Sequence, residues 1–239
     1  MIVMANSRRA EQLSLAIDDP ATPALPRRLR PMVPLHGAAP FDDVDFFFEP
    51  WWPGSSALLY IEDGNARLET EHLVDPLAAF PELAGLGRQF QKDGVVVEGT
   101  LLALDEEGRP DADLLRSLLV HRSDTADDRP LGTAAFVASD MLYAAGRPIG
   151  GNAFEERRAR LTRELIESDN LVVSRGLRGE GLTLAEAVAS MGLTDISARL
   201  LSGCYRPGHQ DESWLRLPVT ETPLAPRRPL LALLQRLPL

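Results

Sequence analysis

The side chains that could do chemistry in this sequence are few and scattered. Four histidines, His36, His72, His121 and His209, show no metal-ligand spacing, and we interpret them as surface residues. The single cysteine, Cys204, excludes an intramolecular disulfide and a cysteine-rich zinc site. The chain has neither a Gly-x-x-x-x-Gly-Lys phosphate loop nor a Gly-x-Ser-x-Gly nucleophile elbow. The enzyme classes that carry those motifs are therefore excluded.

Two short segments contain side chains that could bind or react with a ligand. Lys92 supplies an amine, but Lys92-Asp93-Gly94 runs directly into a β-branched segment, and we interpret it as a turn that enters a strand. Trp51 and Trp52 are adjacent indoles. If the chain is extended there, one ring faces a core and the other a pocket. The pocket-facing ring could fill that pocket, stack on a nucleobase or contact a partner.

Short strands and hairpins must position these residues. Two strands, 56–62 and 66–70, flank the turn Asp63-Gly64-Asn65, which predicts a hairpin because these residue types favour positive φ. A second apolar, β-branched strand is expected at 95–104, ending at the acidic glycine turn 105–109. Antiparallel pairing is therefore expected.

Helices are predicted between these strands, at 111–121, 153–168 and 183–191. In the last of them Thr183 and Glu186 have the spacing of a capping box, and Gly192 should end the helix. Strands interspersed with helices and hairpins indicate an α+β fold.

The chain divides into three parts by composition. Residues 1–30 predict an arm or linker, with a short helix at about 8–17 and then a proline-bearing connector. Residues 31–217 predict one domain. Residues 218–239 predict a proline-rich tail that ends in a short apolar helix. We expect this helix to pack against the domain of the same chain rather than against a partner. The tail is too short to form an OB-fold domain.

Charge limits the partners that can be expected. The net charge is −10 at pH 7, and such a surface repels duplex DNA on average. The basic clusters are Arg8-Arg9, Arg27-Arg28 with Arg30, and Arg227-Arg228, all near the ends. No run of about 20 apolar residues could cross a bilayer, and the N-terminus lacks an apolar signal core. We expect a cytoplasmic protein.

Seven segments in one order carry a family resemblance that spans residues 31–217. They begin with Pro31-Met32 and Pro40-Phe41-Asp42-Asp43, and the frame Glu49-Pro50-x-Trp52-x-Gly54 follows. Later members are Phe80-Pro81-Glu82-Leu83, 102–111, 139–147, 155–161 and 204–216. This series resembles the adenylation domain of ATP-dependent DNA ligases, most like the bacterial repair type. The resemblance implies a nucleotidyltransferase fold, ATP-grasp-like, with two antiparallel sheets flanking a cleft.

The catalytic lysine of that family is missing here. The family's motif is Glu-Pro-Lys-Trp-Asp-Gly-x-Arg. This chain has Trp51, Pro53 and Ser56 at the positions of the lysine, the aspartate and the arginine. The lysine amine attacks the α-phosphate of ATP to form a covalent lysyl-AMP. An indole cannot do this, so no catalytic residue is assigned.

The resemblance also implies losses at the other functional positions. Thr100 and Thr194 stand where two carboxylates would hold a divalent cation. Glu98 replaces the aspartate before Gly99, and Ser139 replaces the ring that stacks on adenine. Three phosphate-contacting lysines correspond here to Arg199, Arg216 and Pro218.

Some of the nucleotide-contacting positions persist. Glu49, Glu98 and Asp140 keep a carboxylate, and Asp140 could orient groups at the pocket or be a satisfied strand-end carboxylate. Arg199 and Arg216 could hold a phosphate without being nucleophiles. A vestigial nucleotide site is therefore expected at Glu49, Trp51, Glu98, Asp140, Arg199 and Arg216, with no metal site.

We therefore expect a ligase-like protein of DNA repair and recombination that has lost adenylation and binds DNA or a DNA-repair protein. ATP and Mg²⁺ enter only through the family resemblance. The alternatives are a residual ATP-dependent DNA ligase or adenylyltransferase that works with other subunits, and a reversible nucleotide-binding sensor.

Overall fold

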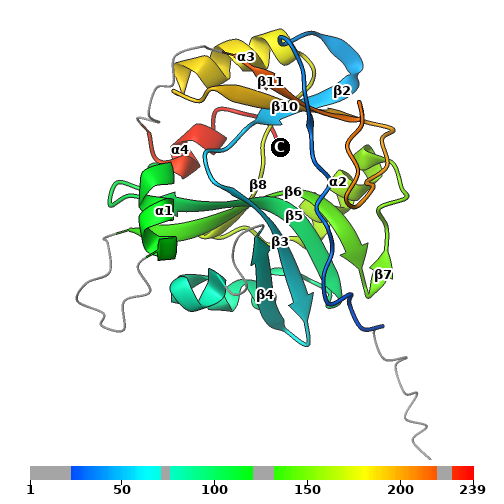
Figure 1. Cartoon of the computed structure of the whole chain (residues 1–239), viewed down its shortest axis with the longest axis vertical. Helices are drawn as coiled ribbons and strands as arrows, with labels where there is room; N and C mark the ends of the chain where they lie inside the picture. The colour runs from blue at the N-terminus through cyan, green and yellow to red at the C-terminus, as the bar shows by residue number, and fades with distance from the viewer. Residues whose placement is uncertain (1–22, 71–75, 121–131, 220–227) are drawn as a thin grey trace, which may run out of the picture.

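The computed structural model describes residues 23–70, 76–120, 132–219 and 228–239, which form two sheets with helices around them. Figure 1 shows the smaller sheet above the larger one. In the five-stranded sheet the spatial order is β1-β11-β10-β2-β9, with bounds Leu35–His36, Trp214–Pro218, Asp195–Leu200, Asp43–Pro50 and Leu177–Gly179. Only the pairing of β1 with β11 is parallel among the described strands of this sheet.

The six-stranded sheet has the order β4-β3-β5-β6-β7, and β8 pairs with β6 off this path. Its strands are β3 (Ser55–Glu62), β4 (Asn65–Thr70), β5 (Val95–Leu104), β6 (Thr133–Ala144), β7 (Arg147–Pro148) and β8 (Leu171–Val173). The β6–β8 pair is parallel and the other described pairs are antiparallel. The expected α+β fold with two largely antiparallel sheets is confirmed.

Helices cover the outer face of the larger sheet. They are η1 (Pro76–Ala79), η2 (Pro81–Gln89), α1 (Ala112–Val120) and α2 (Phe154–Glu164). Leu83 and Leu86 of η2, Leu115 of α1 and Leu161 of α2 join an apolar cluster with the outward side chains of β3, β5 and β6. This cluster fixes one face of the larger sheet, so its other face is left for the site.

A second apolar cluster ties the two sheets together. It contains side chains of both sheets with helices α3 (Gly181–Ser190) and α4 (Leu230–Leu234). Leu230, Leu233 and Leu234 are almost fully buried in it, and Figure 1 shows α4 beside α1 between the two sheets. The expected short apolar helix therefore forms and packs against the domain.

Most local predictions agree with the structure. Asp63 and Gly64 have φ of 52° and 70°, as the two-residue turn between β3 and β4 requires. Gly192, at φ of 83°, follows α3. The predicted helices are present as α1, α2 and α3, and the 105–109 turn leads into α1.

The predicted helix boundaries need three corrections. Helix α2 ends at Glu164 and not at 168, because Leu165 is extended and bridges to Phe90. Helix α3 begins at Gly181, two residues before the expected start. The capping box is wrong, since the residue that precedes α3 is Glu180 and it makes no side-chain cap hydrogen bond.

The segment that precedes β1 crosses both sheets. Leu25 and Met32 are buried against Leu58, Tyr60 and Val96 of the larger sheet. Tyr60 and Tyr205 accept hydrogen bonds from the backbone N–H groups of Leu29 and Met32. In Figure 1 this dark blue segment runs in front of both sheets.

The expected helix at 8–17, the Arg8-Arg9 cluster, His72 and His121 lie outside the described residues. Within the described parts of the chain, no helix is long and apolar enough to span a bilayer.

Candidate functional site

The cleft-facing sides of four strands meet at one point between the sheets. Side chains alternate along a strand, so Glu49 of β2 and Arg199 of β10 face the cleft while Phe48 and Ala198 face the apolar cluster. Glu98 of β5 approaches from the other sheet. We call this space the inner cleft. It is lined by Glu49, Pro50, Trp51, Trp52, Ser56, Glu98, Gly99, Thr100, Ser139, Ser197, Arg199 and Trp214.

The inner cleft is almost full. Its cavity has a volume of about 20 Å³. One water molecule needs at least about 10–15 Å³ on the same measure. The cavity can therefore hold a water molecule and not a nucleotide.

Arg199 fills the centre of the inner cleft. Its Nη2 donates to Glu98 Oε2 at 2.7 Å, and its guanidinium lies 3.5 Å from Asp140 Oδ2 and 3.7 Å from Glu49 Oε1. The guanidinium carbon is also 3.7 Å from the centre of the Trp214 ring. Arg199 thus contacts three carboxylates and an indole.

Asp140 is held by a second arginine. Arg157 Nε and Nη2 donate to Asp140 Oδ1 and Oδ2 at 2.9 and 2.7 Å, which is a bidentate pair. Arg157 Nη1 donates to the backbone oxygens of Asn152 and Gly203. Asp140 is therefore a satisfied carboxylate, as one of the two expectations for this residue has it, but it lies inside β6 and not at a strand end.

Glu49 faces a third arginine. Arg158 Nη1 lies 3.7 Å from Glu49 Oε2, and Nη2 of Arg158 donates to the backbone oxygen of Ser174. Arg158 Nη1 and Glu49 Oε2 are buried and have no hydrogen-bond partner among the described residues. This contact is longer than those that hold Asp140 and Glu98.

Six buried residues thus form one charged cluster, in which three carboxylates balance three guanidiniums. No member is more than 7% exposed. We call Glu49, Glu98, Asp140, Arg157, Arg158 and Arg199 the charged cluster. Buried charges are tolerated when they are paired, and here the pairing joins both sheets to α2.

Burial shifts the proton equilibrium of Glu98. Removal from water raises the pKa of Glu98 to about 7, although the positive charge of Arg199 acts against this shift. Burial would lower the pKa of Arg199, but Glu98 and Asp140 reverse this effect and raise it, so Arg199 stays charged. Glu98 therefore titrates near neutral pH.

The two indoles lie as expected. Trp52 is 2% exposed in the cluster between the sheets. Trp51 is half-buried at the mouth of the inner cleft, and its backbone N–H donates to the oxygen of Asp195. The Arg216 guanidinium lies 4.6 Å from the Trp51 ring centre, and the Trp214 ring lies 6.3 Å away. One face of the Trp51 ring is therefore already occupied.

The residues present do not fit a divalent cation. Thr100 lines the inner cleft as a neutral side chain, and Thr194 Oγ1 donates to Asp195 Oδ2 at 2.6 Å. The nearby carboxylates of Glu98 and Asp140 are ion-paired with the guanidiniums of Arg199 and Arg157. Nowhere in the described residues do three or more histidine, cysteine, aspartate or glutamate side chains form a metal-binding group.

The structure separates the other sequence-predicted positions. Ser139 lines the inner cleft with Arg199, whereas Thr194 and Pro218 do not line it. Arg216 lies outside the inner cleft and donates to Asp195 Oδ2 at 2.9 Å. Burial acts to raise the pKa of Asp195, but the hydrogen bonds that Asp195 accepts from Arg216 and Thr194 outweigh burial, so its pKa is lowered.

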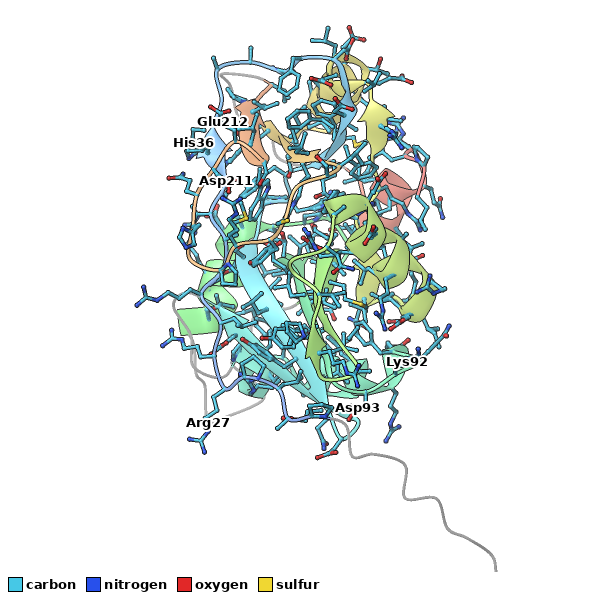
Figure 2. All side chains as sticks on the ribbon, turned by 90° about the vertical axis from the view of Figure 1, so that its right-hand side faces the viewer. Arg27, His36, Lys92, Asp93, Asp211 and Glu212 are labelled. Carbon is cyan, nitrogen blue, oxygen red and sulfur yellow. The ribbon has the colours of Figure 1, made fainter. Side chains whose placement is uncertain are left out.

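A larger space opens outside Trp51. This outer groove has a volume of about 740 Å³. One wall is the segment before β1, and the others come from both sheets. Its lining residues are Arg28, Leu29, Arg30, Pro31, Met32, Val33, Pro34, His36, Trp51, Ser56, Leu58, Glu69, Thr70, Gly208 and Arg216. Figure 2 shows the segment running from Arg27 up to His36 along one side of the molecule.

Lys92 is the only lysine in the chain. It is exposed in the turn before β5, and Asp93 of the same turn accepts hydrogen bonds from the Asp63 and Gly64 backbone. In Figure 2 Lys92 and Asp93 lie at the lower end of the molecule, far from His36. Lys92 is not among the residues that line the inner cleft or the outer groove.

Sequence reasoning missed Arg157 and Arg158 as site residues. Both lie on the buried face of α2 with Phe154 and Leu161. The spacing of Phe154 and Leu161 marks that face, and positions three and four residues after Phe154 fall on it. This spacing could have identified both arginines as buried.

Comparisons with known proteins identify relatives of this chain by sequence and by fold. No family model matches the chain. The chain is 28% identical over 189 residues to the multifunctional non-homologous end joining DNA repair protein LigD of Mycobacterium tuberculosis, covering 79% of this chain and 24% of that protein. It is 31% identical over 163 residues to LigD of Pseudomonas aeruginosa, covering 66% of this chain and 18% of that protein. The chain thus spans a quarter or less of these two relatives.

Solved structures show the same fold. Mycobacterial DNA ligase D in complex with ATP and MES matches with a TM-score of 0.64 and 25% identity, over 80% of this chain and 60% of the other. The ATP-dependent DNA ligase of bacteriophage T7, in complex with ATP, matches with a TM-score of 0.53 and 14% identity, over 79% and 68%. The second match is a likeness of fold alone.

Proposed function

From the homology of this chain to the adenylation domain of ATP-dependent DNA ligases, we propose that it is a non-catalytic component of DNA repair. One observation carries the proposal. The inner cleft, where the family resemblance would put the reacting phosphate of the nucleotide, is filled by Arg199 and its carboxylates, with Trp51 at the mouth. Its role is to bind a repair protein or nucleic acid rather than to join ends.

Adenylation needs an amine that reaches the α-phosphate of ATP. Trp51 has no such group, and a guanidinium such as that of Arg199 is not a nucleophile at neutral pH. Lys92 has the only lysine amine of the chain and is remote from the inner cleft. The alternative of a residual ligase that uses another lysine therefore reduces to Lys92.

DNA or a DNA-repair protein is proposed as the partner. The LigD relatives are named for non-homologous end joining, and the same process is the proposed setting here. The net charge of −10 favours a protein partner or a confined contact over broad binding of duplex DNA.

Intact-mass spectrometry tests the loss of catalysis. The full chain is incubated with ATP and Mg²⁺ beside an active DNA ligase and beside Lys92→Arg. We expect an adenylate adduct on the active ligase and none on this chain or its variant. An adduct that disappears in Lys92→Arg identifies the residual ligase, and an adduct on both forms identifies another nucleophile. Either adduct overturns the proposal.

Reversible nucleotide binding is the second candidate function. The observation that favours it is the 740 Å³ outer groove, which carries Arg28, Arg30 and Arg216. Ligand pockets commonly have about 300–1,000 Å³. Calorimetric titration with ATP tests it, repeated with Arg30→Ala, Arg216→Ala and Arg199→Ala. Heat that is lost in the first two variants and kept in the third supports a sensor, and no heat with the wild type excludes it.

A further inference from the structure

We propose that the outer groove binds a short peptide segment of a partner protein in which acidic and apolar residues are mixed. This inference rests on the proposed function, because it names the kind of partner that a non-catalytic component would hold. The groove has a volume of about 740 Å³, against about 20 Å³ for the filled inner cleft. It accommodates a few residues of extended chain rather than a folded domain.

The charge of the groove differs from that of the whole chain. Arg28, Arg30 and Arg216 line it against one carboxylate, Glu69, although the chain as a whole carries −10. Arg28 lies 3.6 Å from Glu69, which neutralises that pair. Arg216 is paired with Asp195 at 2.9 Å, so the excess positive charge of the groove lies at Arg30, which is complementary to a carboxylate.

The two arginines differ in how they are paired. Arg30 is exposed and forms no ion pair with the described residues, so a ligand carboxylate can replace the water around it. Arg216 is already paired with Asp195 through Nη2, and its Nε is buried away from the groove, so we assign the ligand carboxylate to Arg30.

The walls between these arginines are apolar. Leu29, Met32 and Leu58 line the groove, and Val33 is 52% exposed there. Burial of exposed apolar area favours a ligand with apolar side chains. A carboxylate for Arg30 and apolar groups for these walls are both found in one mixed peptide.

Nucleic acid fits this surface less well. Bases bind single-strand grooves by stacking on aromatic faces. The groove has one indole, that of Trp51, and one imidazole, that of His36, and the Arg216 guanidinium covers one face of the Trp51 ring at 4.6 Å. A strand also carries one negative charge per nucleotide toward an acidic protein. A peptide with two or three carboxylates meets less repulsion and gains from the apolar walls.

Selection from a peptide library tests the inference. Random eight-residue peptides displayed on phage are selected on the full chain, with counter-selection on Arg30→Glu. We expect recovered peptides to combine aspartate or glutamate with aliphatic or aromatic residues. The most enriched peptide is then made with a fluorescent label, and its binding is measured by fluorescence anisotropy.

Matched variants locate the binding surface. Arg30→Glu and Val33→Asp change exposed groove residues, and Arg147→Glu and Val44→Asp make the same changes at exposed sites elsewhere. We expect affinity to fall about tenfold or more in the groove pair, as for the loss of a charge-assisted contact, and to change less than about twofold in the control pair. Circular dichroism confirms that all four are folded.

Three results would overturn the inference. These are peptides without acidic enrichment, peptides that bind the groove variants as well as the wild type, and an oligothymidylate of about 12 nucleotides that binds in an Arg30-dependent way. The last would assign the groove to nucleic acid. The intact-mass measurement keeps the two proposals apart, because an adenylate adduct refutes the loss of catalysis whichever peptides are recovered. Absence of both an adduct and acidic peptides refutes only the peptide site.

Discussion

Replacing Arg199 by methionine should unfold the protein more easily, because Arg199 is the centre of the charged cluster. The substitution keeps an unbranched apolar stem and removes the charge. It leaves Glu98, Asp140 and Glu49, which lie 2.7, 3.5 and 3.7 Å from the guanidinium, with only two arginines. Removal of one partner from a buried ion pair costs about 3–5 kcal/mol, since the other charge remains unpaired.

A second substitution makes this reasoning specific. Glu98→Gln combined with Arg199→Met leaves two carboxylates and two guanidiniums, so the cluster is balanced again. We expect the double variant to lose less stability than the sum of the single variants, by about 1–3 kcal/mol. Arg109→Met is the control, since its pair with Asp105 is solvent-screened and its loss should change the unfolding free energy much less.

Urea unfolding followed by tryptophan fluorescence measures these free energies at pH 7.5. The reasoning is refuted if Arg199→Met costs less than about 1 kcal/mol, as an exposed pair would. It is also refuted if the changes in unfolding free energy of the two substitutions are additive, because additivity means that Glu98 and Arg199 do not interact.

Three further predictions concern pH, catalysis and the C-terminal helix. The folded-state pKa of Glu98 is about 7 against an ordinary value of 4.5, so the folded protein holds the extra proton between these values, and the unfolding free energy falls as pH rises through this window. Glu98→Gln should remove this decrease, on the order of 3 kcal/mol in total, in urea unfolding between pH 5 and 8. An equal slope in both proteins would contradict the raised pKa. Trp51→Lys should still give no adenylate adduct with ATP and Mg²⁺ by intact mass, because Arg199 keeps the reacting space filled; an adduct would mean that the lost amine was the only defect. Leu233→Ala should cost about 2–5 kcal/mol, since Leu233 is fully buried between the sheets, and a loss below 1 kcal/mol by urea unfolding would place α4 outside the stable core.

The sequence predicted well where local chemistry decides the structure. The Asp63-Gly64 turn and the end of α3 at Gly192 depend on residues that adopt positive φ, and both were identified without tertiary information. The two indoles were predicted to face opposite ways, because alternation along an extended chain is geometric. The predicted start of α3 at Thr183 was wrong, because tertiary packing extends that helix to the buried Gly181.

The sequence grouped the candidate site residues but did not show how they are paired. Resemblance to ligases grouped Glu49, Glu98, Ser139 and Arg199, and these residues line one cavity in the structure. It suggested that Arg199 keeps a phosphate contact, which needs a free guanidinium. Whether a guanidinium is free depends on the carboxylates that surround it, and those come from β2, β5 and β6. No local pattern reports that pairing.

Charge balance is consistent with the proposed loss of a metal ligand at Thr100. A metal-dependent cleft can hold more carboxylates than guanidiniums, because the divalent cation balances the excess. Without that cation, a further carboxylate at Thr100, beside Glu98 on the same face of β5, would leave four acids against three arginines in the charged cluster. Uncompensated buried charge is strongly destabilising. Under the proposed loss of adenylation, threonine at position 100 keeps the charged cluster at three carboxylates and three guanidiniums, so the cluster can be buried without a cation.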